Sequence, residues 1–187
     1  MSERFFISDL HLGHANILRY DNRPFNTVEE NDEAIIERWN GKVKKEDTVY
    51  ILGDVSWHSN EKTIELLGRL NGHKNLIIGN HDSKALNSSS VRNKFENGYH
   101  YFEVPAPGGS GIVLCHYPIP CFKNHFQGWY HFYGHVHVTK EHDLMLATRK
   151  MVEDETKAKC LMINVGCMMP YMDYTPRSFE EIVQNIK

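Results

Sequence analysis

The chain has 187 residues, of which 41% are hydrophobic, and this suffices for one core that buries about 70% of the unfolded chain's surface. Its 21 basic and 24 acidic residues give a formal net charge of -3. That balance argues against a protein that holds nucleic acid mainly by backbone charge, although it allows a local basic patch. No apolar run reaches the length of a membrane span, and the first ten residues, MSERFFISDL, are too polar for a secretory signal. We therefore expect a cytosolic protein with a single domain over residues 1–187 and no membrane partner.

Six short segments have the composition of β-strands. They are rich in β-branched and aromatic residues and are bounded by turn formers. In chain order they are residues 3–8, 48–53, 75–79, 99–104, 111–115 and 160–165.

Helices are expected between the first three strands and at the C-terminal end. Thr27 and Glu30 form a capping box for a helix that we expect Gly41 to stop. Ser59 is suited to cap a second helix, which ends near Gly72. Another capping box opens a last helix in SFEEIVQNIK, residues 178–187.

The alternating order β-α-β-α-β predicts a parallel or mixed sheet with helices on its faces, in a sandwich of two or three layers. The later strands lack long helical spacers, and PAPGGSG at residues 105–111 is typical of a hairpin connection. We therefore expect the second half to be more antiparallel. Residues 138–159 are charged with only weak strand character, which favours an excursion or a lid loop.

Nearly every predicted strand ends in side chains that bind metals. In open α/β sheets, ligands bind at the carboxyl ends of the strands, so these side chains should converge. Taken singly, each motif also fits a helix cap or an ordinary turn, but five coincidences at five strand ends are hard to treat as independent. The residues are Asp9 and His11, Asp54, Asn80 with His81 and Asp82, His116, and His135 with His137.

The spacing of His135 and His137 predicts that both rings lie on the same side of an extended strand, because side chains alternate with a period of two. The chain has 12 histidines in all, and neutral imidazole is the commonest metal ligand in proteins. Carboxylates, imidazoles and an amide oxygen form a mixed oxygen and nitrogen set that suits Mn²⁺, Fe or Zn²⁺. Seven such ligands exceed the needs of one ion, and one carboxylate can bridge two. A metal pair of this kind clamps a phosphoryl group and acidifies the water between the ions.

Five motifs, taken together, resemble those of the calcineurin-like metallophosphoesterases. They occur in the order of that family, and the C-terminal sequence also resembles that of its small bacterial and phage members. The motifs are S-D-L-H at 8–11, G-D-V at 53–55, G-N-H-D at 79–82, C-H-Y-P at 115–118 and G-H-V-H at 134–137.

The resemblance implies an α/β fold, a four-layer α/β/β/α sandwich of mixed sheets flanked by helices. It also implies a phosphoesterase that uses two divalent metal ions and a bridging hydroxide, with Mn²⁺ favoured and Fe, Zn²⁺ or Ni²⁺ as alternatives.

The family's residue roles transfer to matching positions of this sequence. His81 would be the histidine that gives a proton to the leaving oxygen, and Asp82 would orient its ring. Asp54 would bridge the two ions. The first ion would be held by Asp9, His11 and His137, and the second by Asn80, His116 and His135.

Departures from the family's protein phosphatases narrow the expected activity. Gly53 is followed by D-V-S-W-H rather than D-R-G, and Ile78 stands where those enzymes have an arginine. The family's repair nucleases and lipid-precursor pyrophosphatases are longer than this chain. We expect a small phosphoester substrate, a diester before a monoester. The alternatives are a nuclease for short or single-stranded nucleic acid, and a non-catalytic metal-binding scaffold.

Three residues outside the motifs are candidates for substrate contact. Arg23 offers a bidentate fork for phosphate oxygens, against the alternative of an ordinary salt bridge. His14 and Asn16 follow the first motif within one helical turn. Trp57 and His58, just after Asp54, either line the pocket or belong to the core.

The cysteines give a weaker pattern. Cys115, Cys121, Cys160 and Cys167 contain no CxxC pair, and we expect mostly buried thiols. A structural zinc site at Cys115, His116, Cys121 and His125 is disfavoured, because it lacks paired short knuckles and leaves the other ligands unexplained.

Overall fold

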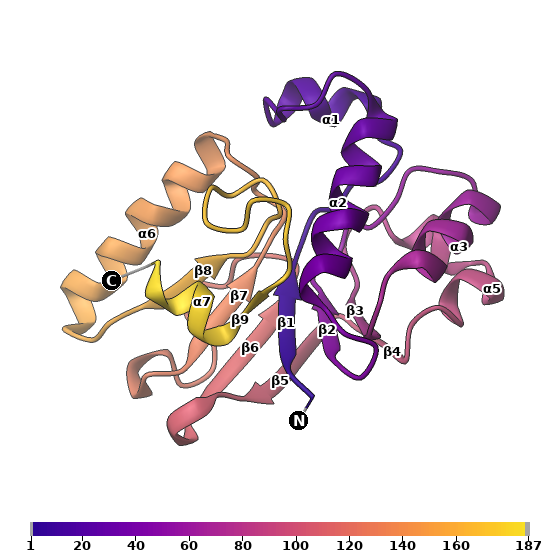
Figure 1. The fold of residues 1–187 in the computed structure, drawn as a ribbon. Helices are drawn as coiled ribbons and strands as arrows, with labels where there is room; N and C mark the ends of the chain where they lie inside the picture. Colours follow the sequence, from indigo (N-terminus) through magenta and orange to yellow (C-terminus); the bar gives the residue numbers. More distant parts are fainter. Residues whose placement is uncertain (1, 186–187) are drawn as a thin grey trace.

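The computed structural model describes residues 2–185, and two β-sheets lie face to face at its centre (Figure 1). The first sheet has the order β4-β3-β2-β1-β9, and the second has the order β5-β6-β7-β8. The strands are β1 (Arg4–Ile7), β2 (Thr48–Ile51), β3 (His73–Ile77), β4 (Asn97–Tyr99), β5 (Tyr101–Pro105), β6 (Gly111–Cys115), β7 (Tyr130–Tyr133), β8 (Leu161–Asn164) and β9 (Arg177–Ser178).

Helices surround the two sheets (Figure 1). They are α1 (Ala15–Tyr20), α2 (Val28–Lys42), α3 (Asn60–Arg69), α4 (Ser83–Leu86), α5 (Ser89–Arg92), α6 (Lys140–Thr156) and α7 (Phe179–Gln184), with 3-10 turns η1 (Pro107–Gly109) and η2 (His125–Gln127). The part of the predicted last helix at 186–187 lies outside the described residues. In the part of the chain that the structure covers, no helix has the length and apolar character needed to cross a membrane.

The first sheet follows the predicted β-α-β-α-β order. Strands β1, β2 and β3 pair in parallel, because α2 and α3 carry the chain back across the sheet between them. The Thr27 hydroxyl caps α2 by accepting from the amide of Glu30, and the Ser59 hydroxyl caps α3 in the same way. Helix α2 runs through Gly41 and ends at Lys42, one residue later than predicted.

The second sheet corrects the expected strand direction. The hairpin predicted at residues 105–111 joins β5 and β6, which are antiparallel. The following pairs, β6 with β7 and β7 with β8, are parallel. The second half is therefore less antiparallel than expected, because η2 and α6 provide crossovers that the sequence pattern did not reveal.

Aromatic side chains pack the two sheets against each other. Phe6 of β1 meets Phe132 of β7 edge to face, with ring centroids 5.0 Å apart. Its neighbour Phe5 points to the opposite face of the sheet, where Lys42 of α2 lies over its ring. With α2, α3 and α5 on one side and α6 on the other (Figure 1), the expected α/β/β/α sandwich is confirmed.

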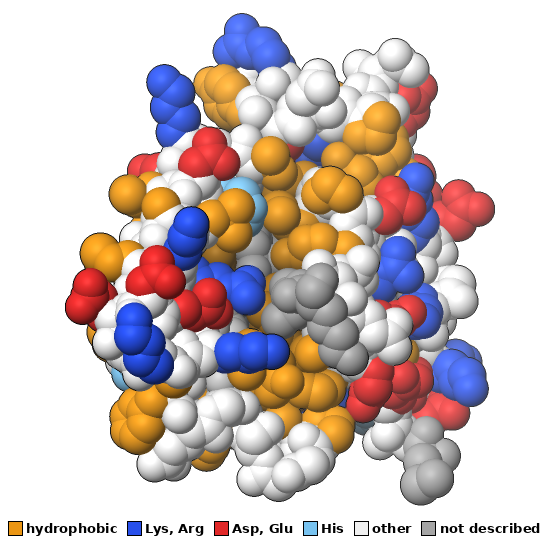
Figure 2. All heavy atoms as spheres, turned by 90° about the vertical axis from the view of Figure 1, so that its left-hand side faces the viewer, with side chains coloured by type: hydrophobic (Ala, Val, Ile, Leu, Met, Phe, Trp, Pro, Cys, Tyr) orange, Lys and Arg blue, Asp and Glu red, His pale blue; other side chains and the backbone are white. Residues whose placement is uncertain are grey.

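Residues 138–159 form a helix rather than a loop. Helix α6 has one buried residue, Val152, which packs on the outer face of the second sheet. Figure 2 shows this face, where apolar side chains line a recess flanked by charged ones. A cavity of about 560 Å³ on α6 is lined by Tyr130 and Leu161, at the starts of β7 and β8. It is therefore at the opposite end of these strands from the predicted ligands.

Candidate metal centre

The ends of the parallel strands bring the predicted ligands together. Asp9, Asp54 and Asn80 follow β1, β2 and β3 in the first sheet, and His116 and His135 follow β6 and β7 in the second. The backbone of Ser8 joins the two sheets, because it donates to the carbonyl of Val165 and accepts from the amide of Cys167. The site therefore lies on the seam between the sheets.

The backbone at the site is strained. A positive φ is uncommon for a residue with a side chain, and it persists where the surrounding structure enforces it. Ten non-glycine residues in the described part of the chain have a positive φ, and five of them are predicted metal ligands. These five are Asp9, His11, Asp54, His135 and His137.

This conformation corrects one expectation. His135 and His137 do not lie on an extended strand, because both residues have left-handed backbone angles in the turn after β7. The His135 ring faces Asn80, whereas the His137 ring faces His11. The two histidines of the H-x-H motif therefore contact different residues.

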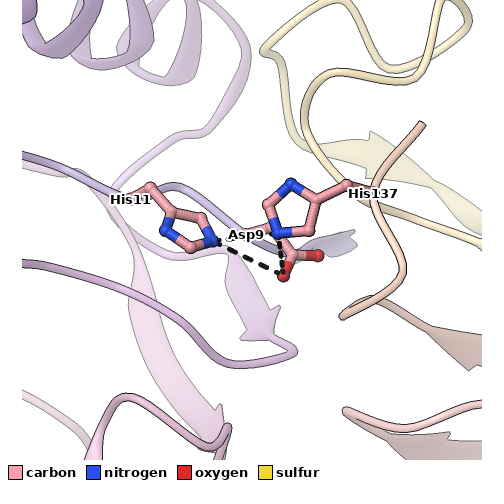
Figure 3. A group of neighbouring side chains, drawn as sticks. All are labelled: Asp9, His11 and His137. Atoms are coloured by element: carbon pink, nitrogen blue, oxygen red, sulfur yellow. Dashed lines mark hydrogen bonds and ion pairs between the residues drawn. The ribbon is translucent and has the colours of Figure 1, made fainter. Parts of the chain in front are cut away.

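Asp9 lies between the rings of His11 and His137 (Figure 3). Its Oδ1 atom is 3.9 Å from Nε2 of His11 and 3.7 Å from Nε2 of His137. The two Nε2 atoms are 3.2 Å apart. These three ligand atoms are close enough to share one metal ion.

A second group adjoins the first. Oδ2 of Asp54 is 3.7 Å from Nε2 of His116 and also 3.7 Å from Nε2 of His11. The side-chain oxygen of Asn80 is 2.9 Å from Nε2 of His116 and 3.0 Å from Nδ1 of His135. Asp9, Asp54 and His116 are also close enough to hold an ion. Asp9 therefore contributes to both groups, although the resemblance assigned it to one.

The protonation of these groups fits a cation. Burial lowers the pKa of His11 well below 6.5, helped by nearby positive charge, so its ring is neutral. Nδ1 of His116 donates to the carbonyl of Leu52 at 2.7 Å, which leaves Nε2 free to bind a metal. Burial raises the pKa of Asp9, since its carboxylate is costly without a positive partner. A divalent ion would supply that partner, and the residues present fit it.

Two glycines let the backbone approach the carboxylates. A Cβ atom on Gly79 would lie 2.7 Å from the amide nitrogen of Asp54. A Cβ atom on Gly134 would overlap the Ser8 hydroxyl and the Asp9 carboxylate. Neither position has room for a side chain, so glycine is required where the loops cross.

His81 and Asp82 lie beside the ligands but do not interact as predicted. The amide of His81 donates to Oδ1 of Asp54 at 3.0 Å, and its exposed ring faces Trp57 with centroids 4.4 Å apart. Asp82 is buried and accepts from the amides of Asp54, Val55 and Gly79 at 2.8 to 3.0 Å. Asp82 thus fixes the loop that carries Asp54, and the predicted contact with the His81 ring is corrected.

Arg23 is also placed differently from the prediction. It is 5% exposed, and its five N–H groups are all engaged, by the carbonyls of Asp9 and Leu10 and the side chains of Asp21 and Asn31. No donor of this guanidinium remains for a substrate phosphate. The alternative of an internal salt bridge, to Asp21 at 3.0 Å, is the one that the structure supports.

His14 lies next to a ligand, and Asn16 lies further away. Nδ1 of His14 is 3.3 Å from Nδ1 of His11, so it partners that ring. Both rings stack on Trp57, with centroids 4.4 and 4.5 Å away. Asn16 is exposed on α1, and no hydrogen bond ties it to the described part of the site.

A cleft opens next to the ligands. Its volume is about 690 Å³, and its lining includes Trp57, Asn80, His81, Ser83 and Lys84. Of the two interpretations given to Trp57, the structure favours the pocket, since its side chain is 36% exposed. His58 also lines this cleft, and its ring is held by Asp32 at 2.7 Å.

The cysteines take no visible part in the site's ligand set. Cys115, Cys160 and Cys167 are buried, and Cys121 is exposed. His116, which the zinc alternative required, faces Asn80 and Asp54 instead.

One residue near the ligands was missed. Asp21 accepts a hydrogen bond from Nδ1 of His137 at 2.8 Å. Its position in the sequence Y-D-N-R-P, far from the H-x-H motif, gives no indication of that contact.

Comparison with known proteins identifies the family. A model of the calcineurin-like phosphoesterase superfamily domain matches residues 5–182. An uncharacterized protein of Methanocaldococcus jannaschii is 34% identical, over 100% of this chain and 93% of that protein. The Gene 66 protein of Mycobacterium phage L5 is 34% identical over 63% of this chain and 64% of its own length. A protein of unknown function from Aquifex aeolicus has a crystal structure with a TM-score of 0.72 and 26% identity, covering 99% of this chain and 100% of that one. The chain belongs to the calcineurin-like phosphoesterase superfamily.

Proposed function

We propose that this protein is a metal-dependent phosphoesterase that hydrolyses a small phosphoester, a diester in preference to a monoester, at a site for two divalent ions. The observation that carries the proposal is the position of Asp54. Its Oδ2 atom is 3.7 Å from Nε2 of His11 and 3.7 Å from Nε2 of His116. These two histidines belong to different ligand groups. A carboxylate between two imidazoles of separate groups has the geometry of a bridging ligand.

In the proposed hydrolysis, the ions and the side chains of the protein have different roles. When bound, two ions would neutralise charge on the phosphoryl oxygens and lower the pKa of a water molecule between them. His81 lies at the rim, on the side of the cleft, with its ring exposed. From there it would donate a proton to the leaving oxygen, as a general acid. Trp57 packs against the His81 ring, with the ring centroids 4.4 Å apart.

The charge of the cleft supports a diester. Lys84 is the one lysine or arginine in its described lining, and the guanidinium of Arg23 is engaged in the interior. A monoester carries a second negative charge on the terminal phosphate and gains most from a guanidinium fork. A diester carries a single charge and needs less compensation. The donor set of carboxylates, imidazoles and an amide favours Mn²⁺, with Fe, Zn²⁺ and Ni²⁺ as alternatives.

The test is hydrolysis by purified, metal-loaded protein. With Mn²⁺ supplied, we expect turnover of bis(p-nitrophenyl) phosphate to exceed that of p-nitrophenyl phosphate, and a chelator to abolish both. Metal analysis of Asp54→Asn, beside wild type, should find two ions per chain falling to one or none. Folded protein that holds two ions but hydrolyses neither compound would instead support the scaffold alternative.

A further inference from the structure

Asp21 is the first residue after α1, and it contacts a predicted metal ligand. Its side chain is 1% exposed. One carboxylate oxygen, Oδ1, accepts a hydrogen bond from Nδ1 of His137 at 2.8 Å. The other, Oδ2, accepts from Nε and Nη2 of Arg23 at 3.1 and 3.0 Å. The two oxygens thus have separate partners.

Arg23 holds Asp21 in a fixed place relative to the other ligands. Besides its bonds to Asp21, it donates to the carbonyl of Asp9 at 2.9 Å and to the carbonyl of Leu10 at 2.9 Å. The carbonyl of Asp9 belongs to a metal ligand itself. The guanidinium of Arg23 therefore connects the Asp21 carboxylate to the backbone of the loop after β1 through hydrogen bonds.

The hydrogen bond decides which nitrogen of His137 carries a proton. With Nδ1–H donated to Asp21, the Nε2 lone pair points into the site, 3.7 Å from Oδ1 of Asp9. Metal-binding histidines commonly donate their other ring nitrogen to a carboxylate, which fixes the tautomer and raises the basicity of the ligand. We propose that Asp21, held by Arg23, is the positioning residue that sets the tautomer and orientation of His137 for the ion shared with Asp9 and His11. This inference rests on the proposed metal site.

An internal salt bridge alone does not explain the arrangement. The pair with Arg23 uses one oxygen of Asp21, and the other oxygen is directed at the ligand ring. Where the structure gives an Nδ1 partner for another predicted ligand ring, that partner is an uncharged group. His116 donates to a backbone carbonyl, and His11 lies against His14. The Nδ1 of His137 instead donates to a buried carboxylate, that of Asp21. A buried carboxylate is costly unless hydrogen-bond donors surround it.

The experiment uses Asp21→Asn, which keeps the size of the side chain. The two donors of Arg23 would hold the introduced amide oxygen on their side, so the amide NH₂ would face Nδ1 of His137. That contact favours the tautomer with the proton on Nε2, where it blocks the metal. Nitrogen NMR of metal-free protein at alkaline pH, where imidazole is neutral, should show Nδ1–H in wild type and Nε2–H in the variant. Affinity for one of two Mn²⁺ ions should fall by about 10- to 100-fold.

Asp47→Asn is the matched control. Asp47 is also buried, at 3% exposure, and its oxygens accept from the amides of Glu3 and Lys44, at the other end of β2 from the site. This variant should keep both ions and the wild-type tautomer of His137, even if its melting temperature falls. A loss of Mn²⁺ affinity in Asp47→Asn equal to that in Asp21→Asn would overturn the inference, because any buried amide substitution would then have the same effect.

The remaining outcomes separate the inference from the proposed function. Asp21→Asn that binds both ions with wild-type affinity, or keeps Nδ1–H on His137, overturns the inference while the proposed function stands. Wild-type protein that binds no divalent ion overturns the proposed function and the inference with it. Selective weakening of one ion, with the tautomer changed, supports the inference whether or not a substrate is turned over.

Discussion

The histidines predicted to bind metal differ in the partner of their second ring nitrogen. The Nδ1 atom of His116 faces the carbonyl of Leu52, and that of His137 faces Asp21. The sequence predicted that these residues would converge, because strand ends in parallel sheets meet at one edge. It could not predict the partners, because these come from whichever loop the tertiary fold brings beside each ring. The role of Arg23 could not be predicted for the same reason. An arginine at this position in the sequence is equally compatible with a substrate contact and with a buried internal salt bridge.

The catalytic role proposed for His81 is the easiest to separate from metal binding. Its backbone contacts Asp54, but its ring lies exposed at the cleft. We expect His81→Ala to bind both ions and to lose about 10²- to 10⁴-fold in turnover, the usual contribution of a general acid. Steady-state kinetics with metal analysis of the same samples measures both effects.

The leaving group provides the control for His81. A phosphoester with an acidic leaving group, such as p-nitrophenol, needs little protonation, so the deficit of His81→Ala should be smaller on it than on an alkyl ester. Equal deficits on both substrates, or loss of metal in proportion to activity, would contradict the role of proton donor.

At the scale of secondary-structure elements, short loops after buried strands do most to shape the site. Asp82 accepts three amide hydrogen bonds from two of these loops, and five predicted ligands have left-handed backbone angles. Strain of this kind costs about 1–3 kcal/mol per residue and persists because the strands and hydrogen bonds on either side fix the loop.

Gly134 tests how tightly the loop after β7 is packed. In Gly134→Ala the methyl group would overlap Ser8 and Asp9, which lie beneath it. We expect a loss of about 1–3 kcal/mol in unfolding free energy, typical of overpacking, together with weakened metal binding. Urea unfolding of metal-free protein and metal titration measure the two effects.

Gly41 offers a glycine of the opposite kind. It lies in α2, and a Cβ atom there would contact nothing within 4 Å. Gly41→Ala should therefore stabilise the protein by about 0.5–1 kcal/mol, as alanine does in a helix, and leave metal binding unchanged. If Gly134→Ala behaved like Gly41→Ala, the loop after β7 would be looser than the structure indicates.

The elements that the sequence predicted share a strong local pattern. β1, β2, β3, α2 and α3 have caps, apolar periodicity or both. Helix α6 was missed because it buries only Val152, so it lacks an apolar stripe that would give a helical period. β4 was missed because Asn97–Tyr99 contains one large apolar residue in three, and such a strand forms only through its pairing with β3.

The whole molecule is held together by contacts between the two sheets. The four-layer arrangement came from the family resemblance, whereas periodicity alone suggested two or three layers. Period-two patterns show that a strand has a buried face but not which sheet covers it. The contact of Phe6 with Phe132, far apart in sequence, is of the kind that a local pattern cannot reveal.

The stability of the molecule should depend on pH through His131. This residue is fully buried, and burial lowers its pKa to about 4 against the two carbonyls that face it. The unfolded chain takes up this proton near pH 6.5, so it binds more protons than the folded state between the two pKa values. Stability is therefore complete above about pH 6.5 and is lost progressively as the pH falls to about 4. The loss corresponds to about 3 kcal/mol.

Urea unfolding of metal-free protein over that pH range measures this dependence. His131→Gln removes the titrating group, so its unfolding free energy should fall less steeply with acidification than that of wild type. His100→Gln, at an exposed position, should follow the wild-type slope. Parallel slopes for wild type and His131→Gln would show that His131 is not responsible.

The seam between the sheets has a consequence for how the parts of the chain depend on each other. Asp54 follows β2 of the first sheet and His116 follows β6 of the second, and 3.7 Å separates Oδ2 of Asp54 from Nε2 of His116. An ion held by both would act as a crosslink that closes a long loop of the chain, in the manner of a disulfide between distant cysteines. The four cysteines form no disulfide. The metal ions would then be reversible crosslinks between the two sheets, in addition to their proposed part in hydrolysis.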